Sequence, residues 1–485
     1  LPWHRRDRDD RGDSRAAGQH AIVSDGSESG AATSKPFGWR FTAPLLLGST
    51  LNPINSSMLA TGLLGIGLDF HLGPGPSASL ISVLYLCSAV AQPTMGKLST
   101  LFGPRRVFQA GILILLVAGI VGTLAPAFGF LLVSRALIGI GSSAAFPTAM
   151  ALVRKRADSV GMGVPSRVLG NFSIAAQVTV VIGLPLGGLL TGIWGWRALF
   201  FINIPLAVIV FVLTSIGVAR DDPIPASVRG NVLKAVDVPG IILFAGAVTS
   251  LLVLLSDLAT PVWWLLPVFV VLLAGLILWE RRVASPLIDV RMLAGNWPLQ
   301  RTYLRQLLVG LSTYAALYGT SQWMEQSAKL SAETVGLILI PFSAVSILLA
   351  RLISGRGWIR GPLTVTGITI VLTAAVMLIL NQNSSILLMI GMTLLFGLTN
   401  GLASFANQAA LYVQSPADEI AVASGLYRTF SYIGAIFSSS LIGITFGTAA
   451  TDAGLHALAW VLIGIGATVI LLVVLDRRVP RSANT

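Results

Sequence analysis

The stretch GKLSTLFGPRRV, from Gly96 to Val107, lies between two long apolar runs of the sequence. Its first residue and Gly103 are glycines, which allow two helix ends to approach closely because they carry no side chain. Lys97, Arg105 and Arg106 are residues of the kind that accumulates in cytoplasmic loops of membrane proteins. The stretch therefore predicts a short cytoplasmic turn between two membrane helices, and this turn sets the orientation of the chain.

The composition extends this prediction to the whole chain. Of the 485 residues, 54% are hydrophobic and 11% are charged, whereas about a quarter of residues are charged in soluble globular domains. The 50 glycines and 24 prolines also fit transmembrane helices, which tolerate both. A net charge of +12 would suggest a nucleic-acid partner in a soluble protein. Here the charges lie between apolar runs, so we expect a lipid bilayer as the partner and no nucleic acid.

The residues that serve catalysis or metal binding are sparse. The single cysteine, Cys87, lies in an apolar run, so no intrachain disulfide and no cysteine-based metal site is expected. The four histidines are scattered along the sequence. No nucleophile–base pair, metal constellation or phosphate loop can be drawn. We therefore predict no enzymatic activity, no metal and no cofactor.

Apolar runs long enough to cross a hydrocarbon core of about 30 Å, which takes roughly 20 helical residues, decide the topology. Fourteen such runs lie near 41–64, 76–97, 107–125, 128–152, 166–192, 197–219, 237–256, 262–280, 300–324, 334–354, 362–380, 385–410, 419–446 and 454–475. If both termini are cytoplasmic, the inner loops and C-terminal tail carry 21 lysines and arginines, and the outer loops carry only Arg197 and Lys329. This bias predicts fourteen spans, because one missed crossing would invert every later loop.

The runs are grouped as six, two and six, so we predict an all-α membrane protein with two six-helix bundles related by pseudo-symmetry and a central two-helix insertion. The basic stretch Arg351–Val365 follows the second span of the later bundle, as expected for a structural repeat of the stretch at Gly96. The predicted parts are a disordered cytoplasmic tail (1–38), a first bundle (39–219), a linker (220–236), the insertion (237–282), a linker (283–299), a second bundle (300–476) and a cytoplasmic tail (477–485). The first tail is too polar to fold alone and lacks the apolar core of a signal peptide.

The stretch at Gly96 resembles the signature loop between the second and third helices of the major facilitator superfamily of secondary transporters, G-x-L-a-D-r-x-G-r-r/k. The matching residues are Gly96, Leu98, Gly103 and Arg105. Thr100 stands where that family has an aspartate. The resemblance implies that this loop, including Arg106, acts as a cytoplasmic gate.

The fifth predicted span holds a cluster of helix-weakening residues. They are Gly183, Pro185, Gly187 and Gly188. Such residues weaken the hydrogen-bond ladder of a helix and permit bending and close packing. The cluster resembles the G-P-x-x-G-G motif of the superfamily's antiporter branch, with the proline one place later. The following residues, Trp196–Pro205, resemble the W-R-x-x-F-x-x-N-x-P stretch of fourteen-helix drug exporters, so a hinge is implied here.

The fourth predicted span contains an arginine. Arg135, with Gly139, matches the superfamily's R-x-x-x-G motif, and the resemblance implies a role in coupling to protons. A buried arginine is costly in a membrane and normally faces a polar interior. Fourteen-helix drug exporters commonly have an aspartate where Asn52 stands in the first span.

No acidic residue lies in the middle of any predicted span, whereas Arg135 and Arg428 are embedded. The carboxylates left for proton coupling are Glu325 and Asp69, at the outer ends of their spans. The candidate residues for a substrate cavity are Asn52, Asn55, Gln177, Tyr314, Tyr318, Gln322, Asn400, Asn407 and Arg428. Such a cationic lining is expected to reject lipophilic cations and to accept neutral or anionic amphipaths, because like charges repel strongly at low dielectric. Alternatively, carbonyl groups and water neutralise both arginines.

The family resemblance implies a proton-driven exporter of small molecules in the bacterial inner membrane, with both termini cytoplasmic, in which two bundles rock around a central cavity. The residues also leave open a facilitative or uptake permease for a small neutral or anionic solute, since the first span has no acid. A lipid flippase and a non-transporting sensor remain further alternatives, although a sensor would be expected to carry a folded soluble module.

Overall fold

The computed structural model describes residues 36–59, 61–72, 74–224, 232–256, 258, 261–447, 449–476, 479 and 481–482. The chain divides into two units, Leu1–Lys35 and Pro36–Thr485, and the second contains all of the described residues. Most of the predicted N-terminal tail therefore lies outside the described residues, as does most of the predicted C-terminal tail.

The described residues form helices, with one isolated antiparallel bridge between Trp358 and Ser482. The helices are α1 (Trp39–Leu59), α2 (Leu63–Asp69), α3 (Pro74–Phe102), α4 (Pro104–Thr123), α5 (Phe128–Ser143), α6 (Ala145–Ser159), α7 (Ser166–Trp194), α8 (Ala198–Phe201), α9 (Asn203–Gly217), α11 (Val232–Val236), α12 (Val238–Ser256), α13 (Leu265–Glu280), α14 (Val290–Gly295), α15 (Trp297–Gln326), α16 (Ala332–Arg356), α17 (Arg360–Ile379), α18 (Ile386–Gln414), α19 (Ile420–Phe446) and α20 (Asp452–Leu475). Each apolar run predicted from the sequence coincides with one helix or two consecutive helices.

Ten helical segments in the described part of the chain are long and apolar enough to cross a membrane. They are α3, α4, α5 with α6, α8 with α9, α12, α16, α17, α18, α19 and α20. A further apolar helix, α13, is shorter. The prediction of an all-helical membrane protein is therefore confirmed, while the total of fourteen crossings remains a prediction.

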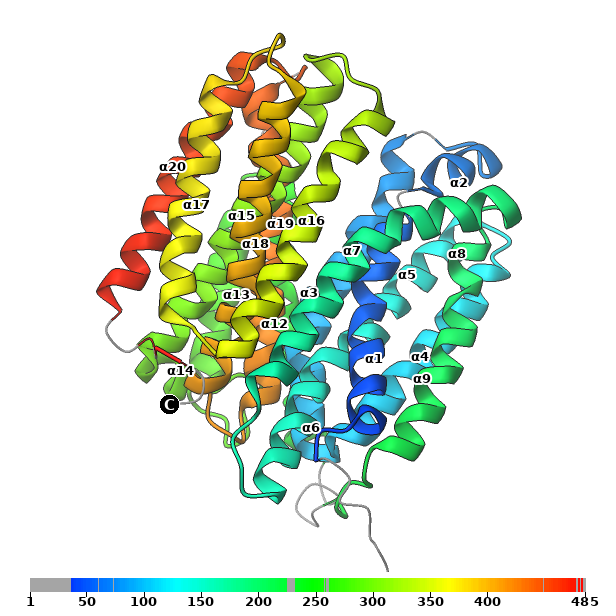
Figure 1. Cartoon of the computed structure of the whole chain (residues 1–485). Coiled ribbons are helices and arrows are strands. Elements are labelled where there is room, and N and C mark those ends of the chain that lie inside the picture. Colours follow the sequence, from blue (N-terminus) through cyan, green and yellow to red (C-terminus); the bar gives the residue numbers. More distant parts are fainter. Residues whose placement is uncertain are drawn as a thin grey trace, which may run out of the picture. The chain divides into compact units, whose positions relative to one another are not determined.

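The turn at Gly103 joins α3 to α4. Gly103 has φ +97°, a conformation that side chains disfavour, and Pro104 starts α4, where its missing N–H group costs no hydrogen bond. We call this end of the helices the Gly103 end and the opposite end, where Trp196 lies, the Trp196 end. Helix α1 begins and α20 ends at the Gly103 end (Figure 1).

The helices pack as a first group, α1 to α9, a second group, α15 to α20, and a central pair, α12 and α13 (Figure 1). The two groups meet where α3 packs against α19 and α7 packs against α16. The central pair forms a hairpin, and α12 also contacts α3 and α19. These helix pairs thus form the interface between the two groups.

Candidate functional site

A buried asparagine lies in the middle of the interface between the groups. Asn52 of α1 donates from Nδ2 to the hydroxyls of Ser88 and Ser142, each at 2.9 Å. Its Oδ1 accepts a hydrogen bond of 2.8 Å from the hydroxyl of Tyr432 on α19. The Tyr432 ring also lies 5.6 Å, between centroids, from that of Tyr85 on α3. Asn52 therefore joins three helices of the first group to the second group.

The helices α3 and α19 are in close contact between this level and the Gly103 end. A Cβ atom on Gly96 would lie 2.6 Å from the carbonyl oxygen of Ala421, and one on Gly425 would lie 2.5 Å from that of Gln92. The Thr429 hydroxyl donates to the carbonyl of Ala89 at 2.6 Å. Only glycine allows the two backbones to come this close. The contact with α19 therefore explains why a glycine stands at position 96.

A second contact between the groups lies on the other side of the interface. Asn400 Nδ2 donates to Gln177 Oε1 at 2.7 Å, which pairs two predicted cavity residues from α18 and α7. The Ser173 hydroxyl donates to Gln408 Oε1 at 3.3 Å. In the described residues, the hydrogen bonds between the groups lie between the level of Asn52 and the Gly103 end. The structure is therefore closed at the Gly103 end.

The arginine of the predicted coupling motif is buried and bonded to carbonyl groups. Arg135 is 2% exposed, and its Nε donates to the Leu80 carbonyl at 3.1 Å. Its two Nη atoms donate to the Asn55 carbonyl at 3.4 and 3.3 Å. The Asn55 side chain is bonded instead to Asn203, at 2.6 and 2.9 Å. No carboxylate pairs with Arg135 among the described residues.

Arg305 is one of the 21 lysines and arginines that the predicted topology assigns to the inner loops and C-terminal tail, and this placement in a loop is wrong. Helix α15 starts at Trp297, so Arg305 lies more than two turns inside it and is 0% exposed. Its Nε donates to Asn407 Oδ1 at 2.6 Å and its Nη2 to the Thr302 hydroxyl at 2.8 Å. Asn407 therefore holds a buried arginine, and the predicted pair of embedded arginines becomes three.

A partly buried arginine at the interface faces an aromatic ring. The guanidinium of Arg428 on α19 lies 4.0 Å from the ring centroid of Phe146 on α6. Tyr314 of α15, within electrostatic range of Arg428, stacks on Tyr318 with 5.8 Å between centroids. Tyr318 is 47% exposed, and Gln322, one turn further along α15, is also exposed. Of the predicted cavity residues, Asn52, Gln177 and Asn400 thus form contacts between the groups, Asn55 and Asn407 are bonded inside their own groups, and Tyr318 and Gln322 are exposed on α15.

An aspartate that the sequence analysis missed holds the loop at Gly103. The two carboxylate oxygens of Asp221 accept hydrogen bonds from the backbone N–H groups of Arg105 (3.3 Å) and Arg106 (2.8 Å). The Arg105 guanidinium donates to the Ser215 carbonyl at 2.9 Å. Asp221 therefore caps α4, where a negative charge is favourable. Its position in the sequence RDDP, a few residues after the end of α9, was the available signal.

A cavity of about 460 Å³ opens beside this loop. Its lining residues include Arg106, Arg154, Lys155, Asp221, Asp222 and Asp418. Lys155 forms an ion pair of 2.7 Å with Asp222, and both side chains are largely exposed. The gate predicted from the sequence therefore lies in a charged region at the surface of the Gly103 end.

The predicted hinge in α7 lies within one continuous helix, which runs through Pro185. Gly183 and Gly187 face α1, since Cβ atoms there would meet Ser57 and Met58. A Cβ atom on Gly188 would meet nothing within 4 Å. Two of the glycines therefore serve close packing on α1, and hinge motion at this cluster remains a prediction.

The two predicted coupling carboxylates lie at the Trp196 end and apart from Arg135. Asp69 Oδ2 accepts from the indole Nε1 of Trp196 at 2.8 Å and pairs with Arg197 at 3.4 Å. The Arg197 guanidinium also lies 4.2 Å from the Trp196 ring centroid. Glu325 is exposed. The structure thus places Asp69 in a surface cluster and does not bring either acid to the buried arginine.

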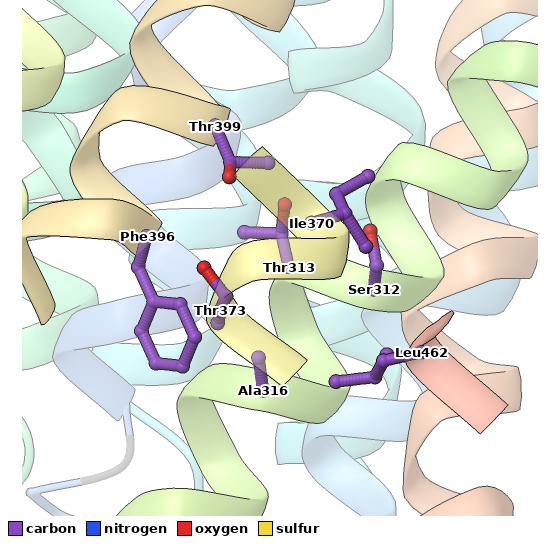
Figure 2. Close-up of a pocket in the computed structure, with 8 residues that line it drawn as sticks. All are labelled: Ser312, Thr313, Ala316, Ile370, Thr373, Phe396, Thr399 and Leu462. Carbon is purple, nitrogen blue, oxygen red and sulfur yellow. The ribbon is translucent and has the colours of Figure 1, made fainter. Parts of the chain in front are cut away.

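The second group contains a small, partly open pocket of about 20 Å³ (Figure 2). Its lining residues are Ser312, Thr313, Ala316, Ile370, Thr373, Phe396, Thr399 and Leu462. The buried hydroxyls of Thr313 and Thr373 have no hydrogen-bond partner among the described residues. A polar space of this size suits one water molecule and is too small for an organic substrate. The cavity is therefore no substrate site.

A family model described as Major Facilitator Superfamily matches residues 45–439. The chain belongs to the major facilitator superfamily. Members of this family are membrane transporters, so the chain is a multi-pass membrane transporter and not an enzyme, as the sequence predicted. The resemblance seen in the loop at Gly96 is thereby confirmed at the level of the superfamily.

Several superfamily proteins are similar over most of their length. The chain is 31% identical over 453 residues to the "uncharacterized MFS-type transporter YwoD" of Bacillus subtilis, covering 92% of this chain and 98% of YwoD. It is 25% identical over 405 residues to the "multidrug resistance protein Stp" of Mycobacterium tuberculosis, covering 80% of this chain and 72% of Stp. Among solved structures, the human organic anion transporter MFSD10 matches with a TM-score of 0.63 and 14% identity, over 90% of this chain and 99% of that chain. At this identity the likeness shows the fold alone.

Proposed function

We propose that this superfamily member is a secondary active exporter of small amphipathic molecules that works by alternating access and proton antiport. The observation that carries the proposal is the interface between the helical groups. Asn52, Tyr432, Gln177 and Asn400 bond the groups to each other from mid-depth to the Gly103 end. A carrier of this class must break such contacts to open toward that side. Export is supported by the resistance proteins among its relatives, such as Stp.

We infer fourteen membrane spans, with the Gly103 end in the cytoplasm. The ten long apolar segments are joined by α1, α7, α13 and α15, each of which coincides with an apolar run of the sequence. Polar residues lower the hydropathy of α1 and α15, because these helices carry asparagines, glutamine and Arg305 toward the interface and the core. In this proposal the two helical groups are the six-span bundles and the central pair is the insertion.

The preferred substrates are proposed to be neutral or anionic amphipaths. Arg135 and Arg305 are buried in the helical groups, and Arg428 lies at their interface over Phe146. The buried acids of the described residues, Asp237, Glu280 and Asp476, lie at ends of helices or just outside them. A cationic substrate would meet unbalanced like charge at low dielectric, which is unfavourable.

Purified protein in liposomes with an imposed pH gradient tests this proposal. A panel of anionic, neutral and cationic amphipaths is offered, and anions and neutral compounds are expected to move against their gradient when protons flow the other way. Asn52→Asp, which adds an acid beside Tyr432, is expected to raise cation transport, whereas Asn383→Asp, which adds an acid in the exposed turn between α17 and α18, serves as the matched control. Preferred transport of lipophilic cations by the unaltered protein would refute the substrate class.

A facilitative or uptake permease is the second candidate, because Arg135 has no carboxylate partner in the described residues. The two candidates differ in cells. Collapse of the proton gradient raises accumulation of the substrate if the protein is an exporter driven by protons. Accumulation falls or stays unchanged if the protein is a permease.

A further inference from the structure

Two buried carboxylates lie side by side where the central pair meets α3. Asp237, directly before α12, and Glu280, the last residue of α13, are each 2% exposed. A Cβ atom on Gly240 would lie 2.2 Å from Asp237 Oδ2 and 2.9 Å from Glu280 Oε1. The two oxygens are therefore within about 5 Å of each other, a separation at which like charges oppose joint ionisation.

The two carboxylates differ in their hydrogen bonds. Asp237 accepts from the N–H groups of Gly240 (3.1 Å) and Leu287 (3.0 Å) and from the indole of Trp279 (2.8 Å). Glu280 accepts one long bond of 3.4 Å, from the N–H group of Ile288, and its Oε2 has no partner among the described residues. Both oxygens of Asp237 therefore have hydrogen-bond partners, whereas one oxygen of Glu280 has none among the described residues. Glu280 is therefore the member of the pair that takes up a proton.

The charged groups around Lys97 come from four parts of the chain, and two of them, Asp237 and Glu280, form the carboxylate pair. Lys97, at the end of α3, is 9% exposed and donates to the Ser285 hydroxyl at 2.9 Å. It lies within electrostatic range of Asp237, Glu280, Asp289 and Glu419. Asp289 precedes α14 and Glu419 precedes α19. Four acids thus lie within electrostatic range of Lys97, and a proton on Glu280 reduces this excess of negative charge.

We infer that Asp237 and Glu280 together bind one proton, and that this proton sets how firmly the central pair holds α3. When Glu280 is ionised, both carboxylates attract Lys97. When it is protonated, Asp237 and Lys97 balance each other and the attraction weakens. Gly96, next to Lys97, packs on the backbone of α19, so weaker holding of Lys97 loosens the contact that closes the Gly103 end. Proton binding at Asp237 and Glu280 does not depend on which substrate the protein transports.

Infrared difference spectroscopy of the purified full chain tests the proton site directly. During a titration through neutral pH, the unaltered protein is expected to show the absorption of a buried protonated carboxyl group that disappears as the pH rises. Glu280→Gln is expected to abolish this absorption, and Glu325→Gln is expected to leave it intact. Its persistence in Glu280→Gln, or its absence from the unaltered protein, overturns the inference.

Two variants probe the surroundings and keep the inference testable if Glu280→Gln does not fold. Lys97→Met removes the positive charge and is expected to move the titration to higher pH. Asp237→Asn removes the neighbouring negative charge and is expected to move it to lower pH. A shift of about one pH unit corresponds to a tenfold change in proton affinity. If neither variant shifts the pH midpoint of the carboxyl absorption, the assignment of this titration to the cluster is wrong.

Hydrogen exchange of residues 96–102 tests the effect on α3. Above the titration midpoint the unaltered protein is expected to protect this segment several-fold better than Glu280→Gln at the same pH. Below the midpoint the two proteins are expected to exchange equally. Equal exchange at every pH would contradict the link between the proton and α3.

Discussion

The two helical groups contain similar devices but hold them in different ways. Each buries an arginine, and each turns a basic loop with a glycine of positive φ, Gly103 in the first group and Gly357 in the second. Arg135 is bonded to backbone carbonyls, whereas Arg305 is bonded to the side chains of Asn407 and Thr302. The backbone carbonyls that bind Arg135 remain when neighbouring side chains are substituted. The hydrogen bonds of Arg305 depend instead on the side chains of Asn407 and Thr302.

Different partners hold the two loops. The loop at Gly103 is held by an acid, and the loop at Gly357 is held by an aromatic ring and by the backbone of Arg481. Asp221 caps α4 in the first loop. In the second, the Arg356 guanidinium lies 5.2 Å from the Trp358 ring centroid, and the Ile359 N–H group donates to the Arg481 carbonyl at 3.1 Å. At this end, the loop of the first group is therefore stabilised by charge. The loop of the second group is stabilised mainly by packing and backbone hydrogen bonds.

The largest expected difference concerns the partners of the two arginines. Asn407→Leu leaves Arg305 Nε without its acceptor in a buried position, which is expected to cost about 3 kcal/mol of unfolding free energy. Asn55→Leu breaks the pair with Asn203 but keeps the carbonyl that Arg135 uses, so about 1 kcal/mol is expected. Denaturant unfolding of both variants in detergent measures the difference. Equal costs would show that the two arginines are held alike.

The second-largest loss of stability is expected when Asp221, which caps α4, is replaced. Asp221→Ala removes the acceptor for two N–H groups of α4, and helix caps of this kind contribute about 1 kcal/mol. Thr100→Asp, which places a carboxylate in the preceding turn of α3 as in the superfamily pattern, is expected to restore part of this loss. The thermal unfolding temperatures of the single and double variants measure both effects. No recovery in the double variant would mean that the two positions are not interchangeable.

The aromatic contact of the second loop should contribute less. Trp358→Ala removes the ring that Arg356 faces, and exposed contacts of this kind contribute about 0.5–1 kcal/mol. Trp358→Phe keeps a ring and is expected to retain most of the stability. If Trp358→Ala unfolds at a lower temperature than Asp221→Ala, the proposed order is wrong, and the aromatic contact contributes more stability than the helix cap.

The sequence predicted the helices well because apolar runs and helix-breaking residues are local signals. It found Gly96 and Arg135 through their motifs, but the motifs did not reveal their partners. Asp221 was missed because it lies far along the chain from the loop that it caps. Arg305 was counted with the loop charges although it lies inside the predicted run 300–324, because it follows the polar start of α15 and the sequence does not show the partners of a buried arginine. Contacts between distant helices are decided by packing, which local patterns do not record.

The smallest expected effect is a pH dependence confined to the first loop. The ion pair with Lys155 lowers the pKa of Asp222, so the folded protein binds a proton there less readily than the unfolded chain. The resulting stability is present above the ordinary aspartate pKa of about 4 and is lost as the pH falls through the lower folded value. Both side chains are exposed, so the contribution is small and is screened by salt.

Asp222→Asn is therefore expected to lower the unfolding temperature slightly at neutral pH and low salt. The difference from the unaltered protein should shrink as the pH falls below about 4 and when the salt concentration is raised. The second loop offers the matched comparison, because the contact of Arg356 with Trp358 involves no acid and the Trp358→Ala difference should stay constant over the same pH range. If both differences changed together with pH, the distinction between a loop held by charge and a loop held by packing would be wrong.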